Sequence, residues 1–264
     1  MITMASVAEV AQWLADVGLN RCVAVSVHGL PAEVWLQPVA EAARTPPHSV
    51  ESGTGPDRST LLLVGHGGRR LWQHLTDDGR RQLTAADDPV DTLSTEATEQ
   101  AIDRQWPDIA RTLLYPHPDC PVDLVALGQV VGWQSPSPLG LGINPRYGLW
   151  SAFRALWQLG DDLESATGSG SAPGAPSLGA ESPDVCADCS THDCVAACPA
   201  GAVRVSERFN LAACSAHRAR PESSCAETCL SRRSCPVGAE HRYSNDQMAY
   251  HYRITRPPVR TEPS

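Results

Sequence analysis

The stretch CADCSTHDCVAACP, residues 186–199, carries the densest chemical signal in the chain. Its thiols are separated by two, four and three residues, and a second block of four thiols follows it at wider intervals. The last cysteine of each block is followed by proline. The eight positions are Cys186, Cys189, Cys194, Cys198, Cys214, Cys225, Cys229 and Cys235. Eight of the ten cysteines thus form one module, whose fold we expect to be organised by what its thiolates bind.

The order of these thiols favours two 4Fe–4S clusters. In two-cluster bacterial ferredoxins, three closely spaced cysteines hold one cluster, and a more distant cysteine followed by proline completes its partner. In this pattern, which we call the ferredoxin exchange, each cysteine that precedes a proline serves the cluster of the other block. One cluster is thus assigned to Cys186, Cys189, Cys194 and Cys235. The other cluster is assigned to Cys198, Cys214, Cys225 and Cys229. The phrase CPAGAV, residues 198–203, also resembles a ferredoxin turn in which small residues let backbone amides approach sulfur.

Other interpretations of the module stay open at this point. Intervals of four, ten, three and five residues depart from the ferredoxin run, so one cluster with spare thiols is an alternative. Four thiolates also suit structural zinc, and disulfides are the remaining alternative. Cys22 and Cys120 lie apart from the module, in apolar or proline-rich surroundings, and are interpreted as ordinary small core residues.

The composition restricts the remaining function classes. The 264 residues include no lysine, which excludes a Schiff-base lysine, a pyridoxal phosphate anchor and a phosphate-loop lysine. A net charge of −9 argues against binding to a nucleic-acid duplex or to an anionic membrane. No apolar run reaches the roughly 18 residues of a membrane span, and the N-terminus lacks a secretory signal. We therefore expect a cytoplasmic protein, in which a cysteine-rich module indicates metal binding.

The part of the chain before the module is predicted to alternate helices with strands. A capping box over 6–9 and apolar residues at helical spacing predict a helix that ends at Gly18. Strands are predicted over 21–28 and 59–64, helices over 93–106, 121–133 and 149–159, and a loop over 42–58. The GHGG sequence at 65–68 is interpreted as a strand–helix connection, with a phosphate-binding turn as the alternative. This alternation favours a layered α/β or α+β domain.

The domain division follows from composition. Residues 164–184 are rich in glycine, serine, alanine and proline and are predicted to be a flexible linker. All seven tryptophans precede this segment, and eight of the ten cysteines follow it. We therefore expect a first domain over 1–163, the linker over 164–184, the cysteine module over 185–240, and a C-terminal segment over 241–264 that returns to the first domain.

Three motifs outside the module resemble one protein family. Residues 143–154 read INPRYGLWSAFR, which resembles IHPRFGGWFAIR of the CblC-type cobalamin-processing proteins. The DPVD at 88–91 and the RYSNDQMAY at 242–250 are similar to that family's DPVD and RYSxxQxAY, in the same order. With the cysteine module, the chain also resembles epoxyqueuosine reductases and reductive dehalogenases. Those proteins pair a nitroreductase-like cobalamin-binding domain with two 4Fe–4S clusters.

This resemblance implies an α+β fold with a nitroreductase-like cobalamin-binding domain and a small ferredoxin-like iron–sulfur domain. The cobalamin-binding residues that it implies are Gly140, Asn144, Pro145, Arg146, Tyr147, Gly148, Trp150 and Arg154. Asn144 replaces the histidine of the family and Tyr147 its phenylalanine. The alternative for Pro145, Gly148 and Trp150 is a turn followed by side chains that face the core.

The function implied is that of an iron–sulfur, corrinoid-dependent reductase, in which 4Fe–4S clusters pass electrons to a bound cobalamin. A low-potential donor such as a flavodoxin or a ferredoxin reductase is the implied partner, and the substrate is a small molecule or the corrinoid itself. Glutathione-dependent dealkylation is disfavoured, because the linker and module stand where the animal proteins have their thiol-binding region. The alternative is a non-enzymatic ferredoxin-type electron carrier.

Overall fold

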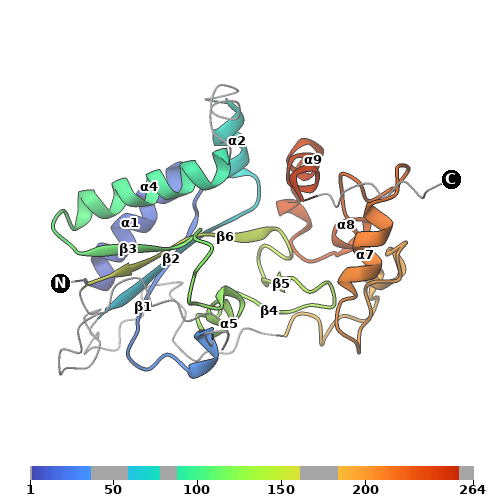
Figure 1. Ribbon diagram of the computed structural model, residues 1–264, viewed down its shortest axis with the longest axis horizontal. Helices are drawn as coiled ribbons and strands as arrows, with labels where there is room; N and C mark the ends of the chain where they lie inside the picture. Colours follow the sequence, from blue (N-terminus) through green and yellow to red (C-terminus); the bar gives the residue numbers. More distant parts are fainter. Residues whose placement is uncertain (1, 37–58, 78–87, 161–183, 256–264) are drawn as a thin grey trace. The chain divides into compact units, whose positions relative to one another are not determined.

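The computed structural model describes residues 2–36, 59–77, 88–160 and 184–255, which form two compact units (Figure 1). Unit 1 comprises the described residues of Met1–His66, His74–Val131 and Ala152–Ala180, and unit 2 those of Gly67–Gln73, Gly132–Ser151 and Glu181–Ser264. The loop expected over 42–58 lies outside the described residues, as does nearly all of the linker expected over 164–184. The functional domain boundaries therefore stay a prediction.

Unit 1 is built on a four-stranded sheet with the strand order β1-β2-β6-β3. The strands are β1 (Arg21–Ser26), β2 (Thr60–Gly67), β3 (Arg111–Tyr115) and β6 (Ser151–Leu159). β1 and β2 run antiparallel with Val23 opposite Leu63, and β3 and β6 are also antiparallel. β2 lies between β1 and β6 and is buried along its whole length, which is the pattern of a strand covered on both faces. The strands predicted over 21–28 and 59–64 are thus confirmed.

Helices α1 (Met4–Asp16) and α4 (Pro89–Gln105) lie side by side over this sheet (Figure 1). α1 begins three residues before its predicted start, because Thr3 and not Ser6 is the N-cap. The Thr3 hydroxyl accepts the Ser6 backbone N–H at 3.1 Å, and the Ser6 hydroxyl accepts the Thr3 N–H at 3.0 Å. The predicted capping box was therefore wrong by one helical turn, although the helix itself is confirmed.

The remaining helices of the sheet region follow ordinary capping rules. α4 is the helix predicted over 93–106, and it begins earlier because Asp88 caps it and Pro89 occupies its first position. α5 (Leu124–Val130) begins after Asp123, whose carboxylate accepts two backbone N–H groups. The other elements are the 3-10 helix η1 (Ala32–Val34) and α2 (Arg70–Asp77). α2 follows β2, so the GHGG sequence is the predicted strand–helix connection.

The helix predicted over 149–159 is wrong, because this segment is the interior strand β6. Ala155, Leu156 and Trp157 are buried in succession, which is the pattern of a strand covered on both faces. The Trp157 indole N–H donates to the Thr98 hydroxyl of α4 at 2.9 Å. The segment contains good helix formers, but pairing with two neighbouring strands outweighs that local preference.

Unit 2 consists of short elements joined by turns. The hairpin β4 (Ser135–Pro136) and β5 (Gly142–Ile143) precedes the cysteine module. The helices that follow are α6 (Asp193–Ala196), α7 (Leu211–Arg218), α8 (Leu230–Ser234), η2 (Ala239–His241) and α9 (Asn245–Ile254). The described elements thus give the mixed helix and strand content predicted. Among the described helices, none is long and apolar enough to span a membrane.

Candidate functional site

Four thiols of unit 2 line a single cavity, and we call them thiol set A. They are Cys186, Cys189, Cys194 and Cys235. Burial, with a smaller contribution from the neighbouring Cys235 thiol, raises the pKa of the Cys186 thiol to about 11. Burial likewise raises the pKa of the Cys194 thiol, to which Cys235 and Cys189 add. Leu139, Ile143 and Leu149 supply apolar walls of the same cavity, in which Cys235 is buried and the other three cysteines are partly buried.

The other four cysteines of the module form a second group, in which neighbouring thiols again raise pKa values, and we call it thiol set B. They are Cys198, Cys214, Cys225 and Cys229. Burial raises the pKa of the Cys214 thiol, and the thiols of Cys229, Cys198 and Cys225 raise it further. Burial raises the pKa of the Cys229 thiol, with Cys225 again adding to the effect. The structure thus brings together the two sets that the ferredoxin exchange predicts, and their roles as ligands stay a prediction.

Backbone N–H groups point at sulfur in thiol set B. The Ala202 N–H donates to the Cys198 sulfur at 3.3 Å, across the turn where Gly201 has a φ of +59°. Burial raises the pKa of Cys198, but this N–H and the Ser231 hydroxyl outweigh burial, so the pKa is lowered overall. The turn therefore does what was expected of its small residues: it brings an amide to the sulfur. In α8, the Arg232 N–H donates to the Cys229 sulfur at 3.4 Å.

Within the described ranges, no group of three or more histidine, cysteine, aspartate or glutamate side chains is close enough to hold a single metal ion. Thiolates around zinc lie about 2.3 Å from the metal, so they lie close to one another. A four-iron cluster is larger than one ion, and its thiolates are spaced more widely.

Asn144 holds the turn of the INPRYG motif in place. Its Nδ2–H donates to the Trp133 carbonyl oxygen at 2.7 Å, and its Oδ1 accepts the backbone N–H groups of Arg146 and Tyr147 at 2.9 and 2.8 Å. Asn144 also pairs with Gly148 through two backbone hydrogen bonds of 2.9 and 2.8 Å. The side chain is buried and its hydrogen-bonding groups are used within the protein, so its role here is structural.

The glycines of this motif make room for neighbouring chain segments. Gly148 has a φ of +56°, and a Cβ at this position would overlap the Val237 carbonyl oxygen. A Cβ on Gly238 would overlap the backbone of Tyr147, so the two segments are in backbone contact. Gly140, with a φ of +68°, lies against Phe209, to which a Cβ would approach within 3.1 Å. Gly148 thus packs the motif against the segment that directly follows Cys235-Pro236.

Trp150 belongs to a buried aromatic cluster. It is fully buried, and its ring meets Tyr243 edge-on at a centroid distance of 5.4 Å. The Arg232 guanidinium lies 4.7 Å from the Trp150 ring and 4.9 Å from the Tyr243 ring, and it donates to the Leu149 carbonyl oxygen at 2.6 Å. The RYS motif and the INPRYGLW motif therefore meet at this arginine, which the sequence reasoning did not single out.

The other motif residues divide between buried and exposed positions. The Tyr147 ring packs over Gly67 and against His241, at a centroid distance of 4.7 Å. Pro145 and Arg146 are exposed at the tip of the turn. Of the cobalamin-binding residues predicted within unit 2, this pair therefore presents side chains to solvent, whereas Asn144, Tyr147, Gly148 and Trp150 pack inside the unit.

Arg154 lies in unit 1, where it joins two of the sequence motifs. Its Nε–H donates to the buried His66 Nδ1 at 3.0 Å, and its Nη1 lies 3.6 Å from the Asp91 carboxylate of the DPVD motif. Burial and the nearby Asp88 raise the pKa of the Asp91 carboxyl, whereas Arg154 opposes them. No spacing pattern in the sequence points to this cluster, because its members come from β2, α4 and β6.

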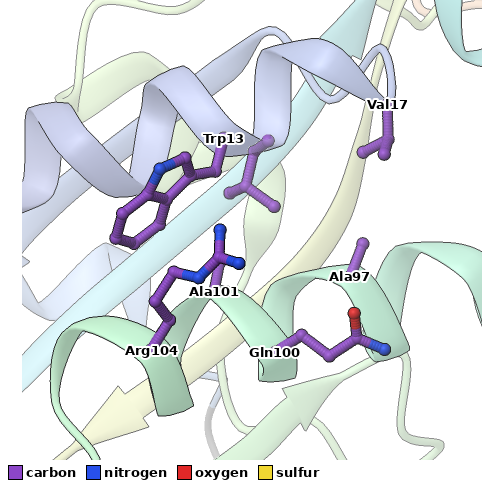
Figure 2. Close-up of a pocket in the computed structure, with 7 residues that line it drawn as sticks. Trp13, Val17, Ala97, Gln100, Ala101 and Arg104 are labelled. Atoms are coloured by element: carbon purple, nitrogen blue, oxygen red, sulfur yellow. The ribbon is translucent and has the colours of Figure 1, made fainter.

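A pocket of about 200 Å³ in unit 1 lies between α1 and α4 (Figure 2). Figure 2 shows Trp13 and Arg104 facing each other across it, and the guanidinium lies 5.0 Å from the indole ring. Its lining includes neither a thiol nor a carboxylate, so it offers no ligands for iron.

No protein-family model and no curated protein matches the chain. The structure is similar to that of epoxyqueuosine reductase from Bacillus subtilis with its catalytic loop swung out of the active site, at a TM-score of 0.53 and 14% identity. It is equally similar, at 15% identity, to epoxyqueuosine reductase with an epoxyqueuosine-modified tRNA stem loop. Both matches cover 96% of this chain and 70% of the other.

A further match is to the B12-trafficking protein CblC of C. elegans, at a TM-score of 0.38 and 13% identity over 79% of this chain and 80% of that one. The resemblance to epoxyqueuosine reductases predicted from the motifs is confirmed at the level of the fold: the chain has a fold similar to that of epoxyqueuosine reductase.

Proposed function

We propose that the chain is an iron–sulfur reductase. Its ferredoxin-like module, residues 185–240, holds one 4Fe–4S cluster on thiol set A and another on thiol set B. The observation that carries this proposal is the division of the eight thiols into two sets of four, of which set A lines one cavity. When bound, such clusters accept and donate single electrons.

The surroundings of the thiols suit this cofactor. Apolar side chains of the 139–149 segment pack against Cys186, Cys194 and Cys235, so they limit the access of water to set A. Backbone N–H groups at Cys198 and Cys229 stabilise negative charge on sulfur. Because burial raises the pKa of most of these thiols, loading with iron must displace their protons, as it does at other thiolate sites.

Protein purified without oxygen is expected to contain about eight iron and eight sulfide per chain, because each cluster holds four of each. Replacing Cys194 by alanine should remove the set A cluster, and Cys214→Ala the set B cluster, so each variant keeps about half of the iron. The control is Cys120→Ser, which lies outside both sets and should keep the full content. Iron and acid-labile sulfide assays provide the measurement. Zinc without iron would overturn the proposal.

The electron acceptor that we propose is a corrinoid, and the donor is a low-potential protein such as a flavodoxin or a ferredoxin reductase. Support for the corrinoid comes from the three ordered motifs and from a fold similar to that of epoxyqueuosine reductase. The buried motif residues of unit 2 support it less, because they have structural roles within the unit. The exposed Arg146, whose guanidinium lies 5.1 Å from the Tyr147 ring, is the side chain of this motif that we expect to meet an amide or a phosphate.

Hydroxocobalamin is expected to bind the anaerobic, iron-loaded protein and to change its visible spectrum. Arg146→Ala should weaken this binding by about tenfold, a typical loss for one hydrogen bond to a charged group. Arg204→Ala is the matched control, since this exposed arginine is paired with Glu207 in the cysteine module. If no spectral change occurs in any redox state, the corrinoid part of the proposal fails, and the chain is a ferredoxin-type electron carrier.

A further inference from the structure

We propose that the two cluster positions differ in reduction potential, with thiol set B the more easily reduced, so that the first electron added to the chain resides at set B. This inference rests on the proposed function, because it concerns the clusters that the two sets hold. The potential of an iron–sulfur cluster depends on nearby charge, on hydrogen bonds to its sulfurs and on exposure to solvent. The described residues around the two sets differ in the first two of these factors.

Two arginines accompany thiol set B. Arg232 follows Cys229 by three residues, donates its backbone N–H to the Cys229 sulfur, and is held by the Leu149 carbonyl and the rings of Trp150 and Tyr243. Arg218 lies on α7, the helix that carries Cys214, and its guanidinium donates to the Tyr252 carbonyl oxygen at 2.8 Å. Both guanidinium groups are anchored, so their positive charge stays close to the sulfurs and favours added negative charge.

Hydroxyl groups also reach the sulfurs of thiol set B. The Ser231 hydroxyl acts on Cys198 and the Tyr252 hydroxyl on Cys229, and each lowers the pKa of that thiol. Ser231 is buried, and Tyr252 is half-buried beneath the Arg218 guanidinium, which lies 4.7 Å from its ring. Hydrogen bonds to the sulfur ligands stabilise the reduced form of a cluster, which carries one more negative charge.

Thiol set A has carboxylates nearby, where thiol set B has arginines. Asp184 accepts the Cys186 backbone N–H at 3.1 Å, and Asp193 lines the cavity next to Cys194. Arg242 opposes them, since it donates to the Cys235 carbonyl oxygen at 3.0 Å. The hydroxyl of Thr191 lies 4.0 Å from the Cys189 sulfur, which makes this contact a weak one. Two carboxylates and one guanidinium leave net negative charge beside set A.

Neither burial nor Glu227, the acidic residue between Cys225 and Cys229, offsets this difference. Each set contains one well-buried cysteine, since Cys225 and Cys235 both have 8% of their surface exposed. Glu227 stands between Cys225 and Cys229 in the sequence, but its carboxylate is exposed and bonded to Arg253 at 2.8 Å. Backbone N–H groups act on sulfurs in both sets, at Cys194 and Cys235 as well as at Cys198 and Cys229. The fixed charge and the hydroxyl donors therefore make the difference, and both favour reduction at set B.

A redox titration of the anaerobic, iron-loaded full chain tests the inference, with electron paramagnetic resonance as the readout. Two one-electron steps are expected, separated by at least a tenfold preference, which corresponds to about 59 mV. Tyr252→Phe removes one hydroxyl donor and should make the first step harder. Asp184→Asn keeps a hydrogen-bond acceptor for Cys186 but removes its charge, so it should make the second step easier. Tyr250→Phe, on the same helix as Tyr252 and stacked on Trp72, should change neither.

The outcomes separate this inference from the proposed function. Protein that contains no iron overturns both. Two clusters that titrate together, or a Tyr252→Phe variant that shifts the second step, overturn the inference and leave the two-cluster proposal intact. Cys194→Ala and Cys214→Ala should each leave a single signal, and the signal that remains in Cys194→Ala must be the more easily reduced one. If those variants do not fold, the two point variants still identify which step belongs to which set.

Discussion

Replacing Gly148 by alanine is expected to destabilise unit 2 by about 3–5 kcal/mol, a large part of the stability of an ordinary domain. Two effects add in this estimate. A side chain at a φ of +56° costs about 1–2 kcal/mol, and forcing a methyl group into a filled space costs about 1–3 kcal/mol or more. The obstacle is the Val237 carbonyl oxygen, which is backbone and cannot swing aside.

Gly201→Ala is the matched control for this variant. Gly201 has a φ of +59°, nearly that of Gly148, but a Cβ there would meet nothing within 4 Å. It should therefore lose only about 1–2 kcal/mol, and the difference between the variants measures the crowding at Val237. Denaturant midpoints followed by circular dichroism give both values. Equal losses would mean that the motif is not packed against the 237–238 segment.

The Gly148 variant also has a consequence for the iron content. Val237 is two residues beyond Cys235, which supplies the distant thiol of set A, so movement of this segment displaces that sulfur. Iron loss is therefore expected at set A before set B. In this chain, the motif that resembles a cobalamin-binding turn is at the same time a support for the first thiol set.

The sequence allowed the helix–strand alternation and both thiol sets to be predicted, because those features depend on local spacing. The ferredoxin exchange places Cys235 with Cys186 by a rule of order along the chain, and the fold brings them together. β6 was mistaken for a helix because Trp150, Phe153 and Trp157 are compatible with helical spacing. Pairing with the neighbouring strands β2 and β3 makes this segment a strand, and in that strand Ala155, Leu156 and Trp157 are buried in succession.

Contacts between distant segments could not be predicted in this way. The pairing of Arg154 with Asp91 and His66 requires three elements of the sheet region to be placed, and each residue alone is an ordinary polar side chain. The same holds for Arg232, whose position between Trp150 and Tyr243 depends on the packing of α8. The resemblance singled out the motif positions, but it did not predict which of them face inward.

A substitution at Asn144 is the sharpest test, within this motif, of whether a residue has a structural role or a binding role. Asn144→Ala should destabilise unit 2 by about 2–4 kcal/mol, because it removes three hydrogen bonds in a buried turn. The Trp133 carbonyl and two backbone N–H groups lose their partner, and each buried group left unpaired costs about 1–3 kcal/mol. The N–H groups regain some hydration at the exposed end of the turn, which keeps the total below the simple sum.

Arg146→Ala is the companion variant, since Arg146 is exposed on the same turn and should change stability by less than about 0.5 kcal/mol. The two variants are expected to have different effects. Asn144→Ala lowers the denaturation midpoint, whereas Arg146→Ala keeps the midpoint and weakens hydroxocobalamin binding. Asn144→His restores the residue of the CblC-type family, but an imidazole cannot reproduce one donor and a doubly accepting oxygen in this turn. The Asn144→His variant should therefore be destabilised to a similar extent as Asn144→Ala. A histidine variant of full stability with tighter hydroxocobalamin binding would instead make position 144 a cofactor contact.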